Sequence, residues 1–190
     1  MSRAYRIKVS ESLSRVIRAG DRVETQLELL DSLPAENMAA LLEQELAGLG
    51  FQRQGDLLVR QQNDVTVEVD ATTGTITARV EADEQLELEK EGEAVVYDDL
   101  TRKQSQQIQE SKREELQEQI QKEVNEVESQ LQKEVTDRLE AELVDLRGEL
   151  DQAVNRITAE ALKQKAAQIG QIKEMTEDQE SGSLTIVLEV

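Results

Sequence analysis

The side chains of this 190-residue chain that could do chemistry are almost all carboxylates. Adjacent pairs such as Asp98-Asp99 and Glu114-Glu115 supply the residue type that glycoside hydrolases use in pairs, and Asp64 and Asp70 supply oxygens that suit a divalent cation. The spacing of a calcium loop is missing, and carboxylates are common throughout this acidic chain. We therefore interpret the pairs as solvated surface and the two aspartates as turn residues.

Residue types that dominate catalytic sites are missing from the sequence. The chain has no His and no Cys, which removes the commonest general base, thiolate nucleophiles and thiolate zinc sites. It contains no glycine-rich loop followed by Lys-Ser or Lys-Thr for phosphate binding, and no Gly-x-Ser-x-Gly turn. The sequence predicts a protein that is not an enzyme, with no catalytic, cofactor-binding or metal-binding residue.

Net charge narrows the class of partner. The chain carries 22 basic and 41 acidic residues, a formal charge of -19. Such a field repels nucleic acid and anionic membranes and suits a basic partner. The N-terminus leads into no apolar signal region, and no stretch approaches 18 apolar residues. We expect a cytoplasmic protein with protein partners and with neither nucleic acid nor membrane as a ligand.

Charges of opposite sign are separated along the chain. A basic block at residues 1–22 contains only Glu11 and Asp21 as acids, whereas the block at 81–99 contains only Lys90 as a base. Opposite charges on neighbouring strands stabilise a sheet modestly, so the two blocks are predicted to lie side by side. The basic residues are Arg3, Arg6, Lys8, Arg15, Arg18 and Arg22.

The elements that must carry these charges begin with strands and one helix. Residues 5–9 alternate apolar and polar, as a half-buried strand does, and Ala19-Gly20-Asp21 predicts a hairpin turn. A helix is predicted from Pro34, with Ser32 as its N-cap, and Gly48 and Gly50 end it. Its apolar stripe consists of Met38, Leu41, Leu42, Leu46 and Leu49.

Short alternating segments after this helix predict a meander. Valines at 65, 67 and 69 precede a turn at residues 70–74, and Ile76, Ala78 and Val80 follow it. Asp, Thr and Gly in that turn favour a hairpin. The fold class is therefore α+β, with a small antiparallel sheet and one packed helix, followed by a long coiled-coil helix or helical hairpin and a C-terminal strand that returns to a sheet.

An apolar residue every three or four positions marks the long helix. Its seam advances by about 3.7 residues per step, close to the 3.67 of nearly straight helix packing. Valine is a weaker helix former than leucine, so a partner must stabilise the helix. The seam, which we predict to be the helix interaction site, consists of Leu116, Ile120, Val124, Val127, Leu131, Val135, Leu139, Leu143, Leu146, Leu150, Val154 and Ile157.

The last residues predict a strand that needs a partner. Its strand-pairing residues are Leu184, Ile186, Leu188 and Val190, and an unpaired apolar strand promotes aggregation. The N-terminal sheet is the predicted partner, although a continuous helix over residues 100–175 would be roughly 110 Å long. Two arrangements stay open: a helix folded back near residues 129–137 or Gly148, or an antiparallel homodimer that exchanges its C-terminal strands.

This pattern divides the chain into three predicted parts. They are an α+β head at residues 1–97, a coiled-coil stalk at 98–176, and a C-terminal linker and strand at 177–190.

Three stretches of the chain resemble a bacterial family. They are the opening Met-Ser-Arg-Ala-Tyr-Arg-Ile-Lys-Val-Ser-Glu-Ser-Leu, the segment 154–163 and the ending 182–187. The likeness spans the chain and points to accessory proteins encoded beside an AAA+ ATPase in FtsH ternary systems. It implies a component that works with a separate ATPase in a stress or conflict response, and it carries over no catalytic residue.

The sequence thus favours a non-enzymatic scaffold or adaptor for protein assembly. The first alternative is a holdase-like chaperone with projecting helices. The second is an acidic inhibitor that mimics nucleic acid, although Lys and Arg are interspersed along the long helix.

Overall fold

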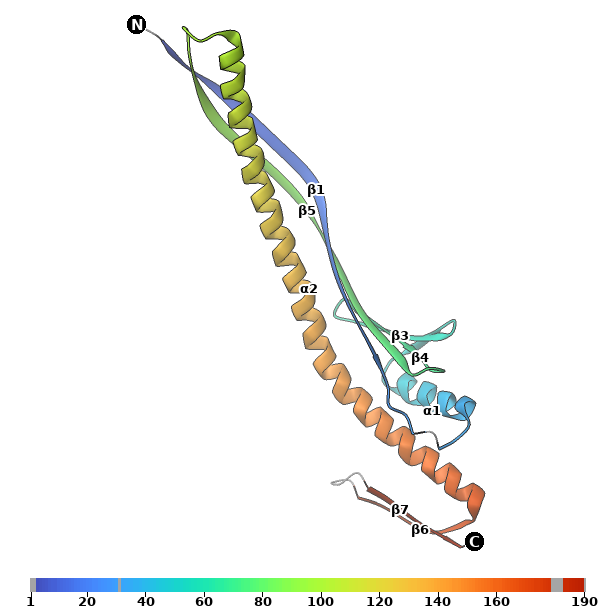
Figure 1. Cartoon of the computed structure of the whole chain (residues 1–190). Helices are drawn as coiled ribbons and strands as arrows, with labels where there is room; N and C mark the ends of the chain where they lie inside the picture. Colours follow the sequence, from blue (N-terminus) through green and yellow to red (C-terminus); the bar gives the residue numbers. More distant parts are fainter. Residues whose placement is uncertain (1–2, 31, 179–182, 190) are drawn as a thin grey trace. The chain divides into compact units, whose positions relative to one another are not determined.

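The protein is an α+β structure, seen here in a computed structural model that describes residues 3–30, 32–178 and 183–189. Two sheets and two helices are formed (Figure 1). A five-stranded antiparallel sheet has the strand order β1-β5-β4-β3-β2, and β6 and β7 pair separately. The elements in chain order are β1 Ala4–Gln26, α1 Ala35–Gly48, β2 Gln52–Gln54, β3 Leu57–Gln62, β4 Val65–Asp70, β5 Thr75–Tyr97, α2 Arg102–Ile169, β6 Gln171–Asp178 and β7 Ser183–Glu189.

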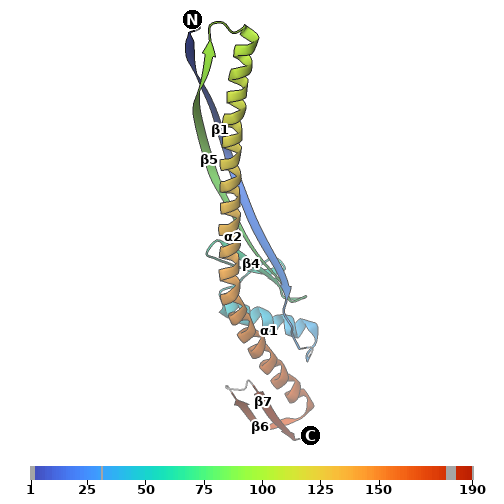
Figure 2. The same ribbon diagram turned by 60° about the vertical axis from the view of Figure 1, so that its left-hand side comes forward.

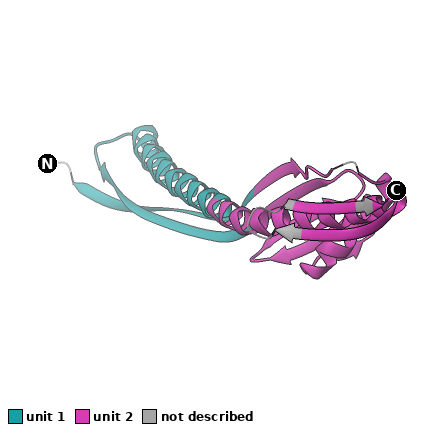
Figure 3. Ribbon diagram, turned by 90° about the horizontal axis from the view of Figure 1, so that it is seen from below, with its two compact units in different colours: residues 1–20, 81–136 teal, residues 21–80, 137–190 magenta. Residues whose placement is uncertain are grey.

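The chain forms two compact units, which Figure 3 colours separately. Unit 1 contains residues 1–20 and 81–136, and unit 2 contains residues 21–80 and 137–190. Strands β1 and β5 and helix α2 each contribute residues to both units. The units therefore follow spatial contact, whereas the predicted head and stalk follow chain order.

Unit 1 is a two-stranded ribbon with the first half of α2 beside it. In Figures 1 and 2, β1 and β5 run side by side along this half of the helix. The N–H of Asp98 donates to the carbonyl of Arg3 at 3.1 Å, so the start of β1 meets the end of β5. Arg6 and Glu93 lie 3.6 Å apart across the ribbon. The prediction that the basic and acidic blocks lie side by side is confirmed.

The predicted hairpin turn at Ala19-Gly20-Asp21 is wrong, because β1 runs through it as a single strand. Ile17, Ala19 and Asp21 are each less exposed than the even-numbered residues beside them, so the alternation passes through Gly20 without a turn. β1 and β5 are each 23 residues long, and each extends the strand alternation well beyond the usual five or six residues.

Unit 2 contains the remaining sheet and helix α1. The β3–β4 hairpin turns through Asn63 and Asp64, whose φ angles of 49° and 65° are those of a tight type I′ turn. At the β4–β5 turn Gly74 has a φ of 72°, which glycine adopts without strain. Val65, Val67 and Val69 are buried, and register pairs join Val65 to Val80 and Asp70 to Thr75.

Helix α1 begins one residue after Pro34, and the prediction of Ser32 as its N-cap is wrong. Pro34 occupies the cap position without a side-chain hydrogen bond, and its carbonyl accepts from the N–H of Met38 at 3.1 Å. Proline already fixes the φ angle that starts a helix. The predicted stripe is confirmed at its centre, where Met38, Leu42 and Leu46 are buried.

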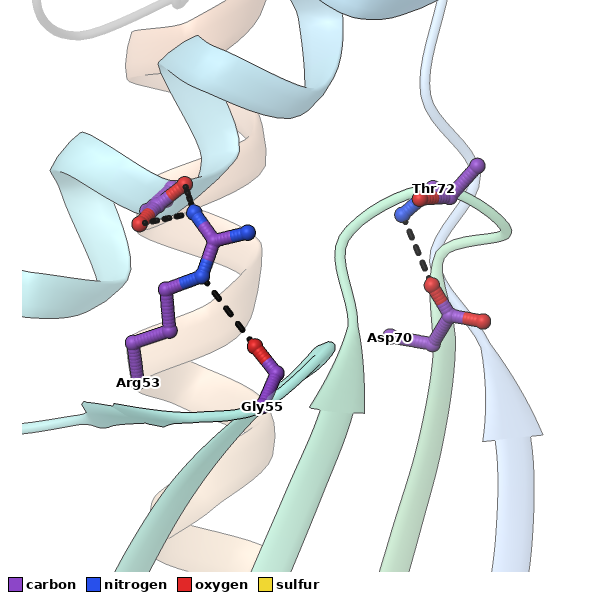
Figure 4. A network of polar contacts seen from close by, with 5 residues as sticks. Arg53, Gly55, Asp70 and Thr72 are labelled. Atoms are coloured by element: carbon purple, nitrogen blue, oxygen red, sulfur yellow. Dashed lines mark hydrogen bonds and ion pairs between the residues drawn. The ribbon is translucent and has the colours of Figure 1, made fainter.

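Arg53 fastens α1 to the short strand β2. Its guanidinium donates to both carboxylate oxygens of Glu43 at 3.0 Å and to the carbonyl of Gly55 at 3.2 Å (Figure 4). On the other side of α1, Glu45 accepts from Arg156 of α2 at 2.7 Å. Charged contacts thus hold α1 within unit 2.

Helix α2 is continuous over 68 residues, so the folded-back alternative is wrong. The prediction of a paired C-terminal strand is confirmed, but its predicted partner, the N-terminal sheet, is wrong, because β7 pairs antiparallel with β6. Strand β6 covers Gln171–Asp178, most of which the prediction placed at the end of the stalk. Strand exchange between two chains is no longer needed to give β7 a partner.

Candidate interaction surfaces

The first half of the predicted seam packs against strands of its own chain. Val124, fully buried, forms a core cluster with Ile120, Leu131 and Ile17 of β1. Leu116 forms a second cluster with Val9 and Ala94. In unit 1 the two strands thus occupy the place that we predicted for a second helix. Half-buried side chains that pack on the first cluster are Leu13, Ala19, Ala82, Leu86, Leu88 and Val127.

The second half of the seam belongs to unit 2, apart from Val135, which is buried in unit 1. Leu143 and Val154 are half-buried and line a groove of about 810 Å³ with Leu27 and Ile76. Polar side chains such as Glu28 and Arg147 line the groove together with these apolar ones. The buried members of this half are Leu139, Leu146, Leu150 and Ile157.

Three of the four predicted strand-pairing residues lie in the β6–β7 sheet. Leu184 pairs with Glu177, Ile186 with Met175 and Leu188 with Ile172. A bulge interrupts the register between Ile172 and Glu174. The fourth residue, Val190, lies outside the described residues.

Ion pairs connect α2 to both strands of the ribbon. In unit 1, Lys90 pairs with Glu123, Arg15 with Glu128 at 3.2 Å and Arg113 with Glu11 at 2.7 Å. These side chains are partly exposed, so each pair contributes little stability. Because they flank the apolar seam, these pairs orient the helix on the strands.

Arg60 of β3 is the one buried cation among the described residues. It donates to Glu149 of α2 at 2.5 Å and to the carbonyl of Leu49 at 3.2 Å, and its guanidinium lies 4.9 Å from the centre of the Phe51 ring. Its Nε is buried without a partner in the described part of the chain. A buried guanidinium that faces a carboxylate fixes the position of α2 in unit 2.

A second buried polar group lies on the same face of α2. Glu142 is 6% exposed and accepts from the side chain of Asn63 at 3.0 Å. Asp64, next in the turn, pairs with Arg138 at 3.3 Å. The β3–β4 turn is therefore joined to α2 by two polar contacts.

The aspartates considered as cation ligands have structural roles in the described chain. Asp70 accepts from the N–H of Thr72 at 2.8 Å (Figure 4) and from the N–H of Thr73 at 3.3 Å. The Thr72 bond and then the Thr73 side chain lower the pKa of Asp70. Asp64 pairs with Arg138 as described above. No group of three or more carboxylates within the described ranges could hold a metal ion.

The outward face of the ribbon carries a row of exposed charged side chains. All odd-numbered residues of β5 from Glu81 to Tyr97 are exposed, and so are the even-numbered residues of β1 from Arg6 to Arg18. Exposed apolar side chains also lie there, with Val16, Val95 and Tyr97 between 43% and 49% exposed. Sequence reasoning identified the charge blocks but did not identify this face.

Sequence reasoning also missed Arg60 and the strand partners of the seam. The signal for the partners was present, because Leu13, Ile17 and Ala19 alternate, as do Leu86 and Leu88. The glycine at position 20 obscured it, because it suggested a turn. No pattern in the sequence distinguishes Arg60 from the exposed arginines.

Comparisons with known proteins identify a family. A family model described as FtsH ternary system domain X5 matches residues 1–190. No curated protein and no solved structure matches the chain. No helix among the described residues combines the length and the apolar character needed to span a membrane.

Proposed function

Because this chain belongs to the family of FtsH ternary system domain X5, we propose that it is a non-enzymatic scaffold or adaptor that binds the AAA+ ATPase of its system. The whole-chain family match carries this proposal. It supports an accessory role, and in our proposal the separate ATPase carries out the nucleotide chemistry. A cytoplasmic location is part of the proposal.

The side chains of the described residues support a binding role better than a chemical one. The chain has no His or Cys, and within the described residues no cluster of carboxylates could hold a metal ion. Its extended elements instead offer long exposed surfaces on β1, β5 and α2. Such surfaces suit contact with another protein at several points along the chain.

Binding to the ATPase tests the proposal directly. The purified chain is mixed with the purified AAA+ ATPase encoded in the same system, and complex formation is measured by light scattering together with the rate of ATP hydrolysis. We expect a complex at about 10 µM of each protein and a changed hydrolysis rate, with no hydrolysis by this chain alone.

The matched control is the pair Val124→Asp and Val144→Asp. Val124 is fully buried in unit 1, whereas Val144 is 73% exposed. If the contact needs a folded unit 1, the first variant loses it and the second keeps it. Absence of any complex with the wild-type chain, in the presence or absence of ATP, would refute the adaptor proposal.

One observation favours the second alternative, an acidic mimic of nucleic acid. From Glu87 to Glu93, carboxylates repeat on the outward face of β5 at every second residue, about 6.6 Å apart along an extended strand. Arg6, Lys8 and Arg18 lie on the neighbouring strand, however, and Arg6 already pairs with Glu93. The adaptor role therefore remains our first choice. Displacement of DNA from a basic protein at equimolar ratio would favour the mimic.

A further inference from the structure

The ribbon of unit 1 has two open edges. Within the described residues β1 has β5 as its sheet neighbour, and the pairing of β4 with β5 ends at Val65 and Val80. Along residues 81–97, β5 therefore has β1 on one side only. Neither strand contains proline. Long unpaired edges are templates for pairing with another chain.

Backbone directions identify the groups that face the open edge of β1. The carbonyl of Arg3 accepts from Asp98 and the N–H of Leu27 donates to Gly74, so odd-numbered residues at both ends of β1 point toward β5. Backbone groups alternate sides along an antiparallel strand, and between Ile7 and Asp21 every even-numbered residue is exposed while every odd-numbered residue except Arg15 is less exposed. The N–H and C=O groups of even-numbered residues such as Ser12 therefore point to the open edge.

The outward-facing side chains of the two edge strands carry charges of opposite sign. The even-numbered residues of β1 from 6 to 18 include three cations and no carboxylate, and the odd-numbered residues of β5 from 81 to 93 include six carboxylates and no cation. All of them are exposed on the same outward face. The cations are Arg6, Lys8 and Arg18, and the carboxylates are Glu81, Asp83, Glu87, Glu89, Glu91 and Glu93.

We propose that copies of this chain assemble edge to edge, with β1 of one copy antiparallel to β5 of the next. Pairing β1 with β1 would place cations opposite cations, and pairing β5 with β5 would place carboxylates opposite carboxylates, which is unfavourable in both cases. Only the β1–β5 contact between copies repeats the opposite-charge arrangement that the chain already uses between Arg6 and Glu93.

This contact is heterologous, so assembly continues beyond a dimer. Each copy keeps one free β1 edge and one free β5 edge until a ring closes. Backbone hydrogen bonds and burial of Val16, Val95 and Tyr97 drive the contact, and the exposed charges select the partner edge. The inference goes beyond the proposed function and needs no ATPase. It also differs from the antiparallel homodimer, which stays a prediction.

The first test is the mass of the purified chain by light scattering between about 1 and 100 µM, at about 20 mM and 500 mM NaCl. We expect species of three or more copies at low salt and smaller ones at high salt, because exposed charges are screened. A chain that stays monomeric under every condition would overturn the proposal, since the edge charges would then serve only to protect the edges.

Proline at Ser12 tests the edge itself. Proline lacks an N–H and is tolerated in edge strands where that group faces solvent. We expect Ser12→Pro to weaken assembly at least tenfold while circular dichroism stays that of the wild type, and the matched Ser12→Thr to leave assembly unchanged. Equal assembly by both variants would refute the role of this edge.

Cross-linking between isotope-labelled copies tests the pairing. Chains labelled with ¹⁴N and ¹⁵N are mixed at high salt, dialysed to low salt and treated with a carbodiimide, which joins amines to carboxylates. Mixed-label products should link Lys8 to the β5 segment 87–93, and Lys8→Gln should abolish them. Mixed products that link Lys8 to Glu11 of another copy would show β1–β1 pairing and contradict the proposal. Binding of the Ser12→Pro variant to the ATPase is measured separately. A variant that fails to assemble and still binds the ATPase shows that edge pairing and the adaptor role are independent.

Discussion

The same helix is held in two different ways in the two units. In unit 1, α2 contacts a ribbon of two strands through small apolar clusters, with ion pairs at its margins. In unit 2, α2 also has polar contacts that each include one buried group, Arg60 with the half-buried Glu149 and Glu142 with Asn63. Apolar contacts alone allow the helix to slide, whereas an ion pair with a buried guanidinium holds it in one position. The position of α2 therefore depends mainly on burial of apolar side chains in unit 1, whereas in unit 2 it depends on specific polar contacts as well.

The largest effect is expected where burial alone stabilises the helix. Val124→Asp places an unpaired charge in the apolar cluster of unit 1, which costs several kcal/mol. We expect hydrogen exchange to lose protection in residues 4–20 and 81–97 and to retain it in residues 57–70. Val144→Asp, at an exposed position of the same helix, should change nothing. Equal loss of protection in both units would show that they unfold together.

Removing the buried cation should break the polar contact of unit 2. Arg60→Ala leaves Glu149 without its partner, opens space beside Phe51 and removes the bond to Leu49. We expect a loss of about 2–4 kcal/mol in the free energy of unfolding, measured by urea denaturation. Glu149→Gln, at a side chain that is 41% exposed, should cost less than half as much. The reverse order would mean that Glu149 has another role.

Substitutions at two glycines, one in each unit, are expected to change stability by smaller amounts and in opposite directions. Gly148 lies inside α2 with no atom within 4 Å of an added Cβ, so Gly148→Ala should stabilise the chain by about 0.5–1 kcal/mol. At Gly92 an added Cβ would lie 2.6 Å from Cε of Lys112 and 3.4 Å from Cδ2 of Leu116. Gly92→Ala should therefore destabilise unit 1 slightly, because the lysine must move. Thermal unfolding of both variants checks the opposite signs.

The smallest effect concerns the β4–β5 turn. Hydrogen bonds from Thr72 and Thr73 lower the pKa of Asp70 below 3.8, so the charged carboxylate stabilises the folded chain above that pH. This contribution should be lost as the pH falls below 3.8 and Asp70 becomes protonated. Asp70→Asn should lower stability at pH 7 and flatten its dependence on pH between 4 and 2. An unchanged pH profile would contradict this assignment.

Much of the fold could be predicted because local patterns specify it. The meander from Val65 to Val80, the stripe of α1 and the long helix all follow from periodicity and turn residues. The hairpin expected at Gly20 failed because one glycine was interpreted as a turn, although the alternation on both sides had the same phase. The N-cap failed because Ser32 and Pro34 are both acceptable starts, and only contacts select between them.

By itself the sequence determined which faces are apolar, where the helix runs and which blocks carry opposite charge. Those properties depend on residue order within a few turns or strand steps. Only the tertiary structure decided that strands and not a second helix cover the first half of the seam, that β7 pairs with β6, and that Arg60 is buried against Glu149. The physical reason is that an apolar stripe requires burial without specifying its partner. The partner is selected by which distant segments the whole chain can bring together.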